Sequence, residues 1–110
     1  MENSEFEKSK AINLADSVNY ANHAIVSKTI VKKQTGNISI FSFDEGESLS
    51  EHTAPFDAVV QIVEGTAEII IEGNSHFVKA GEMIIMPANR PHAVKANEQF
   101  KMILTMIKSD

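Results

Sequence analysis

The sequence predicts an all-β sandwich or barrel, and three features of its pattern support this fold class. From residue 24 onward, short runs rich in apolar and β-branched residues recur at roughly ten-residue spacing. Glycine or proline separates many of these runs from one another. No segment sustains the 3.6-residue period of an amphipathic helix. These features together indicate short strands joined by tight turns.

The strands are predicted from apolar runs that lie between turn signals. Ile25–Lys33 is rich in β-branched residues, and a turn at Gly36 and Asn37 follows it. The later predicted strands are Ala58–Val63, Thr66–Ile71, residues 76–78, Met83–Met86, His92–Lys95 and Lys101–Ile107. Pro87 and Pro91 stiffen the loop that precedes His92.

The strand at residues 38–43 is apolar on both faces. Alternation of side chains places Ile38 and Ile40 on one face and Phe41 and Phe43 on the other. Such a strand must be covered on two sides, either by a second sheet or by a partner subunit.

Length and composition indicate one compact domain. The chain has 110 residues, of which 43% are hydrophobic, and this is enough to form a core. Residues 1–24 are predicted to form a polar arm with a first short element, and residues 25–110 the barrel domain. The first ten residues are polar and are expected to be mobile.

The charge and the absence of cysteine exclude several classes of function. A net charge of −5 argues against a nucleic-acid partner, which requires clustered Lys and Arg. Without cysteine there is no thiol nucleophile, disulfide or thiolate metal site. The first twenty residues do not resemble a signal peptide, and no apolar run reaches the roughly 18 residues that cross a bilayer. A cytoplasmic protein without a membrane partner is therefore expected.

Two histidines are the first candidate site residues. If each segment is a strand, His52 shares a face with Ala54, and His92 shares one with Val94. An imidazole beside small or apolar side chains is typical of a ligand pocket, which is mostly apolar with few polar anchors. The four methionines at positions 83, 86, 102 and 106 are interpreted as adaptable core residues rather than sulfur ligands. Tyr20 has no partner visible in the sequence.

The spacing around His52 resembles the first motif of the cupin superfamily. That motif is Gly-x5-His-x-His, three or four residues, Glu, six residues and Gly. Gly46, His52 and Gly65 stand in register with it, whereas Ala54 replaces the second His and Ala58 replaces the Glu.

The segment around His92 resembles the second cupin motif, Gly-x5-Pro-x-Gly-x2-His-x3-Asn. Gly81, Pro87 and His92 match it. Asn89 takes the place of the second Gly, and Asn also enters positive-φ conformations. Ala96 replaces the final Asn. The resemblance covers roughly residues 36–107 and implies a double-stranded β-helix, or jelly-roll, barrel.

The resemblance also implies what the site would contain. Metal-binding cupins use the two His and the Glu of the first motif and the His of the second, so only His52 and His92 carry over as metal ligands. The implied cofactor is a divalent transition metal. Ala54, Ala58 and Gln61 are predicted to line the pocket, although strict alternation would turn Gln61 away from position 58.

Three further side chains are weaker candidates for replacement ligands than the histidine pair. These are His76, Asp57 and Glu51. Each has a simpler interpretation as a solvated loop or hairpin residue.

Three functions remain open at this point. The first is a small single-domain cupin that binds a small-molecule ligand in its barrel. The second is a weakly metal-dependent enzyme of isomerase, epimerase or dioxygenase type that uses the histidine pair. The third is a regulatory or structural barrel. A homodimer is expected, because a second copy would cover the two-sided strand at residues 38–43.

Overall fold

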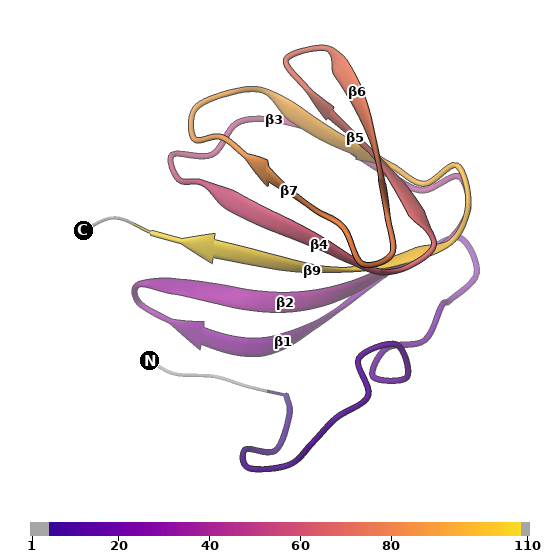
Figure 1. Cartoon of the computed structure of the whole chain (residues 1–110), viewed down its shortest axis with the longest axis vertical. Coiled ribbons are helices and arrows are strands. Elements are labelled where there is room, and N and C mark those ends of the chain that lie inside the picture. The colour runs from indigo at the N-terminus through magenta and orange to yellow at the C-terminus, as the bar shows by residue number, and fades with distance from the viewer. Residues whose placement is uncertain (1–4, 109–110) are drawn as a thin grey trace.

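A computed structural model describes residues 5–108, and the chain folds into two antiparallel sheets without an α-helix in that range. Figure 1 colours the strands by their position along the chain, from indigo at the N-terminus to yellow at the C-terminus. They are β1 (Ile25–Lys33), β2 (Gly36–Phe43), β3 (Ser48–His52), β4 (Ala58–Glu64), β5 (Thr66–Ile71), β6 (Asn74–Lys79), β7 (Met83–Met86), β8 (His92–Lys95) and β9 (Phe100–Ile107). The all-β prediction is confirmed.

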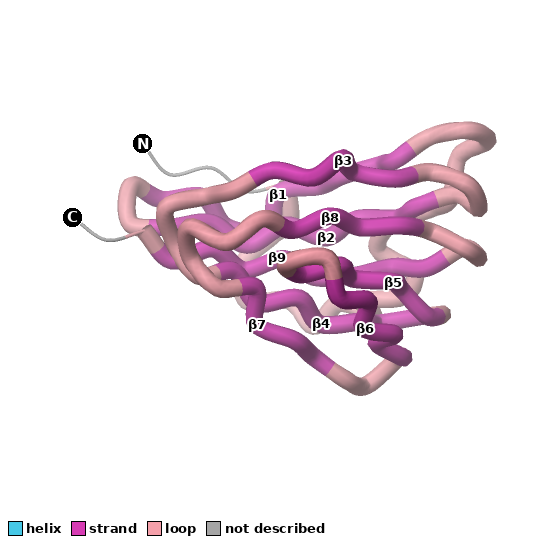
Figure 2. Tube along the Cα trace, turned by 90° about the horizontal axis from the view of Figure 1, so that it is seen from above, coloured by secondary structure: helices cyan, strands magenta, loops and turns pink. Residues whose placement is uncertain are grey.

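The two sheets form the opposed layers of a jelly-roll barrel. One sheet has the order β1-β2-β9-β4-β7, and the other has the order β3-β8-β5-β6. Figure 2 views the molecule from above and lets both orders be followed. Neighbours within a sheet are therefore often distant in the chain, as β3 and β8 are.

In the chain, β4, β5, β6 and β7 all lie between β3 and β8. The pairing of β3 with β8 is therefore a long-range contact, and it places His52 directly opposite His92. The sequence pattern did not mark β3 clearly as a strand. Four of its five residues are exposed, so this edge strand has no apolar alternation to detect.

The main core lies between the two sheets. On β2, Phe41 and Phe43 face inward together, as expected from the alternation. Phe43 and Phe100 are both 0% exposed, and their rings stack with centroids 4.5 Å apart. Inward-facing residues of β4 and β5, such as Val60 and Ile69, complete this layer and are also 0% exposed. Apolar packing therefore joins the two sheets.

The outer face of β2 is covered by the protein's own N-terminal segment, residues 5–24. Ile40 lies outside the main core cluster and yet is 0% exposed, and Val18 in the N-terminal segment is 1% exposed. Ser42 Oγ donates a hydrogen bond to the carbonyl oxygen of Asn19 at 2.8 Å. The strand is covered on both sides, as expected, but its own chain covers the outer face. A partner subunit is not needed for this purpose, and the homodimer stays a prediction.

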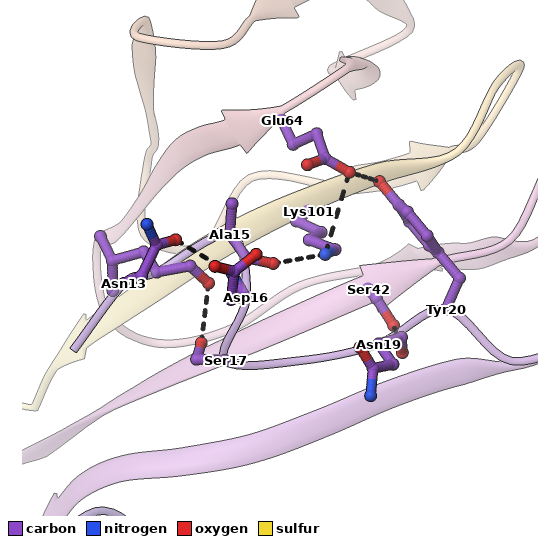
Figure 3. Close-up of polar contacts among 10 residues, drawn as sticks. Asn13, Ala15, Asp16, Ser17, Asn19, Tyr20, Ser42, Glu64 and Lys101 are labelled. Carbon is purple, nitrogen blue, oxygen red and sulfur yellow. Dashed lines mark hydrogen bonds and ion pairs between the residues drawn. The ribbon is translucent and has the colours of Figure 1, made fainter.

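A polar cluster anchors the N-terminal segment, as Figure 3 shows. Lys101 on β9 is 7% exposed, and its Nζ donates to the carbonyl oxygen of Ala15 and lies 4.9 Å from the centre of the Tyr20 ring. The Tyr20 hydroxyl donates to Glu64 Oε2 at 2.6 Å. Burial, followed by this hydrogen bond, raises the pKa of the Tyr20 hydroxyl, so it stays protonated. Tyr20 therefore has the partner that the sequence did not reveal.

The first described residues of the segment also contact the edge of β1. The Glu5 backbone N–H donates to the Thr29 carbonyl oxygen at 2.8 Å, and the Thr29 N–H donates to Glu5 Oε2 at 2.6 Å. Residues 1–10 were predicted to be mobile, and residues 1–4 of this stretch lie outside the described range. Within residues 5–108, no helix is long and apolar enough to cross a membrane.

Candidate functional site

The two predicted histidines lie side by side on neighbouring strands. His52 ends β3, His92 begins β8, and the two residues are direct partners in the antiparallel pairing of these strands. Their Nε2 atoms are 3.2 Å apart, and the rings meet edge to face at 72° with centroids 4.4 Å apart. His92 is 4% exposed, whereas His52 is exposed. One imidazole of the pair is therefore buried and the other faces solvent.

The backbone sets the orientation of both rings. His52 Nδ1 lies 2.8 Å from the Ser50 carbonyl oxygen, and His92 Nδ1 lies 3.2 Å from the Arg90 carbonyl oxygen. A carbonyl oxygen can only accept, so each Nδ1 that makes such a bond carries the proton and leaves a lone pair on Nε2. The 3.2 Å between the Nε2 atoms is also a hydrogen-bond distance: a proton on either Nε2 lets that nitrogen donate to the other, whereas two bare lone pairs at this distance would repel. With both Nδ1 atoms donating, a proton or another cation between the Nε2 atoms removes this repulsion.

Burial opposes a positive charge on His92. Desolvation, and then the neighbouring His52, lowers the pKa of the His92 imidazole, while the hydrogen bond to the Arg90 carbonyl acts in the opposite direction. His92 is therefore held toward its neutral form, which is the form that acts as a ligand or a hydrogen-bond acceptor.

A small cavity adjoins the pair. Its volume is about 60 Å³, and apart from the two imidazoles its walls are apolar. The lining residues are Leu49, His52, Ala54, Phe56, Ala58, Met86, His92, Val94, Met102, Leu104 and Met106. Ala54 and Ala58 thus lie where the sequence placed them. Gln61 does not line the cavity, contrary to the prediction, because it is exposed on β4 between the buried residues Val60 and Ile62.

The weaker candidates for metal ligands lie elsewhere. His76 is exposed on β6, in the hairpin that was predicted for it. Asp57 Oδ1 accepts a hydrogen bond from the Ala88 N–H at 2.8 Å, so this carboxylate holds two loops together. Glu51 is exposed on β3. Among residues 5–108, no group of three or more His, Asp or Glu residues is placed to hold a metal ion.

The ligand atoms at this site can be compared with those needed by the divalent metal that the cupin resemblance implies. For two nitrogen ligands at roughly 2.0–2.1 Å from a tetrahedral ion, the nitrogens would be about 3.3 Å apart. The observed 3.2 Å between the Nε2 atoms fits this geometry. The rest of the set does not, because Ala54 and Ala58 provide no ligand atoms and no carboxylate of the described residues lines the cavity. The site does not fit a divalent ion that needs three or four nitrogen and oxygen ligands.

Reasoning from the sequence missed the thioethers of the site. Met86 and Met102 are buried core residues, as expected, and together with Met106 they also line the cavity beside the histidines, whereas Met83 is 55% exposed and is not a core residue, contrary to the prediction. Strand register could have revealed Met86 and Met106, because both are direct partners of Ala58, on β7 and β9. That register depends on which strands pair, and the strand pattern alone did not indicate it.

A motif position and a family match agree with the resemblance. Asn89, which replaces a motif glycine, has φ = 61°, as expected for a residue type that enters this region. Residues 39–108 match the model of the cupin domain family. The chain belongs to the cupin family. A search of curated proteins found no match.

Solved structures of other proteins resemble this cupin over most of its length. A conserved protein of unknown function from Streptococcus pyogenes is 37% identical, with a TM-score of 0.91 over 96% of this chain and 92% of its own. A cupin 2 conserved barrel domain protein from Leptotrichia buccalis is 44% identical, with a TM-score of 0.85. The match covers 88% of this chain but only 47% of that protein.

An enzyme also shares the fold. A mutant of salicylate 1,2-dioxygenase from Pseudoaminobacter salicylatoxidans is 17% identical, with a TM-score of 0.70. The match covers 76% of this chain and 26% of that enzyme. At this identity the likeness concerns the fold alone, because one barrel architecture hosts many unrelated chemistries.

Proposed function

We propose that this cupin is a binding module that holds a small molecule, or the small end of a larger one, in its barrel cavity. The convergence of the His52 and His92 Nε2 atoms at the wall of an otherwise apolar cavity supports this proposal. Few polar anchors within an apolar lining are typical of ligand sites. The cytoplasmic location expected from the sequence is part of the proposal.

The cavity volume limits what can enter. At about 60 Å³ the cavity is smaller than the roughly 150 Å³ apolar cavity that accommodates benzene. A ligand of a few heavy atoms fits, and any larger ligand must extend past the exposed His52. Short carboxylates such as acetate, pyruvate and lactate are suitable probes, together with the neutral molecules acetone and glycerol.

Thermal unfolding with each probe tests the proposed binding. A probe at 100 times its Kd should stabilise the protein by about 2.7 kcal/mol and raise the Tm. His52→Ala should abolish the shift, because it removes the exposed anchor, and Ala58→Val should reduce it by filling the cavity. The control is His76→Ala, which removes an exposed imidazole of β6 outside the cavity. If no probe shifts the wild-type Tm, the proposal loses its support.

The metal-dependent enzyme is a second candidate, favoured by the 3.2 Å separation of the two Nε2 atoms. The absence of a carboxylate and of a third imidazole among the described residues of the lining weighs against it. Elemental analysis of protein purified without chelators tests it. Stoichiometric Fe, Mn, Ni or Zn that is lost in His52→Ala would support this candidate over the first.

We also propose a homodimer, formed by a different surface from the one suggested by the sequence. Strands β4, β7 and β9 carry Val59, Ile85 and Ile107 around a groove of about 490 Å³. Ile85 is 50% exposed and Ile107 is 68% exposed. Among the described residues, none of the N-terminal segment lines this groove, and a second copy would bury its apolar residues.

Light scattering at micromolar concentration should give the mass of a dimer. The double variant Ile85→Glu and Ile107→Glu should be monomeric, because it places two carboxylates on each side of the interface. Phe77→Ser removes an exposed apolar residue on β6, outside this face, and should remain dimeric. A wild-type protein with monomeric mass would contradict the proposed dimer.

A further inference from the structure

The barrel cavity and the outer groove lie on opposite faces of the same three strands, β4, β7 and β9. One row of directly paired residues on these strands lines the cavity and consists of Ala58, Met86 and Met106. The next row lines the groove and consists of Val59, Ile85 and Thr105. Paired residues point to the same face of a sheet, and successive residues of a strand point to opposite faces. The sheet itself therefore separates the cavity from the groove.

Phe56 is the residue at which this separation ends. It lies in the loop between β3 and β4, directly beyond the end of the sheet. The alternation of β4 continues through this loop, because Ala54 and Ala58 line the cavity whereas Pro55 and Asp57 line the groove. Among the described residues, Phe56 alone lines both. Its ring therefore stands where the cavity and the groove would otherwise meet.

Hydrogen bonds hold the loop on either side of Phe56. The Ala54 carbonyl oxygen accepts a hydrogen bond from the Asn89 N–H at 2.7 Å, and Asp57 Oδ1 accepts one from the Ala88 N–H at 2.8 Å. Both donors belong to the loop before β8, which ends at the buried histidine of the pair. Phe56 itself is half-buried and lies outside the main core cluster. A smaller side chain at this position would therefore change the wall of the cavity more than the packing of the core.

We propose that Phe56 is the specificity-determining residue of the barrel cavity, where its ring forms the end wall and limits ligands to short molecules with a polar head. The inference rests on the proposed function and deepens it, because it concerns the length of the ligand that the same cavity accepts. The polar head lies at His52 and His92, since the rest of the lining is apolar, and an unbranched apolar tail extends toward Phe56. Without the ring, its volume and the adjoining part of the groove would accept a longer tail.

Binding of straight-chain carboxylates of increasing length tests the proposal, with the matching straight-chain alcohols as uncharged probes. Isothermal titration calorimetry measures each Kd. The wild-type protein should bind hexanoate no more tightly than propionate, because the additional CH₂ groups find no room beside the ring. Phe56→Ala should bind hexanoate at least about tenfold more tightly than propionate, since each CH₂ group that leaves water strengthens binding by about fourfold.

The matched control is Phe77→Ala, which makes the same truncation at another phenylalanine. Phe77 is 60% exposed on β6 and lines neither the cavity nor the groove, so this variant should keep the wild-type order of affinities. Phe56→Tyr retains the ring and should retain the limit on length. Thermal unfolding verifies that each variant is folded, and Phe56→Val provides the same comparison if the alanine variant does not fold.

The possible outcomes separate this inference from the proposed function. An unchanged order of affinities in Phe56→Ala, or tighter binding of hexanoate than of propionate by the wild type, would overturn the role of Phe56 and leave the binding module intact. Loss of the length limit in Phe77→Ala as well would also overturn that role. If neither the wild type nor Phe56→Ala binds any acid or alcohol of the two series, the proposed function fails together with the inference.

Discussion

Phe100→Ala should lower the free energy of unfolding by about 3–5 kcal/mol, because it leaves a cavity in the centre of the core. Phe100 is 0% exposed and stacks on Phe43 with ring centroids 4.5 Å apart, so its removal also eliminates an aromatic contact. Urea unfolding followed by circular dichroism measures the change. A loss of this size is a large fraction of the stability of a small domain.

The matched control for this prediction is Phe77→Ala. Phe77 lies on β6 and is 60% exposed, so the same truncation should change the free energy of unfolding by less than about 0.5 kcal/mol. Similar losses of free energy in the two variants would show that Phe100 does not lie at the centre of the core.

Gly65→Ala should be the second strongly destabilising substitution, at about 2–4 kcal/mol. Gly65 lies between β4 and β5 with φ = 78°, a conformation that costs an L-residue about 1 kcal/mol. An added Cβ would also lie 2.4 Å from the carbonyl oxygen of Gln99. Because this neighbour is backbone, it cannot rotate away, and the start of β9 would have to move. Thermal or urea unfolding measures the loss.

Gly73→Ala separates the two causes of that loss. Gly73 has nearly the same φ of 80°, but no atom lies within 4 Å of the position of its added Cβ. It should therefore show only the cost of the backbone conformation, about 1 kcal/mol. If Gly65→Ala and Gly73→Ala lose the same free energy, the close approach of Gln99 has no energetic consequence and this account of Gly65 is wrong.

The strands that carry a clear apolar pattern were predictable from the sequence. Ile25–Lys33, Thr66–Ile71 and Met83–Met86 have the predicted bounds, because each is a run of apolar or β-branched residues between turns. The β3 strand was not clear, because an exposed edge strand has no buried face that its sequence must encode. The motif spacing then predicted the family, which the match over residues 39–108 confirms.

The candidate site was predictable only in part. His52, His92, Ala54 and Ala58 lie around one cavity as expected, since the motif spacing places them in register. The Gln61 amide could serve as a ligand, but its position on β4 turns it away from the cavity. Side chains alternate along a strand, so a residue three positions after the inward-facing Ala58 points outward. The thioethers of the cavity follow from the pairing of β4 with β7 and β9, which is a long-range property.

The packing on the two faces of β2 also shows what the sequence determines and what only the tertiary structure decides. Its two apolar faces required two packing partners, and this requirement can be derived from alternation alone. The sequence did not indicate that the N-terminal segment would be one of them, because the contacts of Ser42 with Asn19 and of Lys101 with Ala15 join residues 23 and 86 positions apart. A polar segment was expected to be an arm, and buried polar contacts attach it to the barrel instead.

The sequence by itself determined the all-β class, the cupin family and the identity of the two histidines, because local apolar periodicity and motif spacing encode these properties. Only the tertiary structure decided that the two Nε2 atoms lie 3.2 Å apart, that the cavity is about 60 Å³, and that methionine side chains line it together with the histidines. The physical reason is that a cavity is formed by side chains from both sheets, and the distances between them depend on strand pairing rather than on sequence spacing.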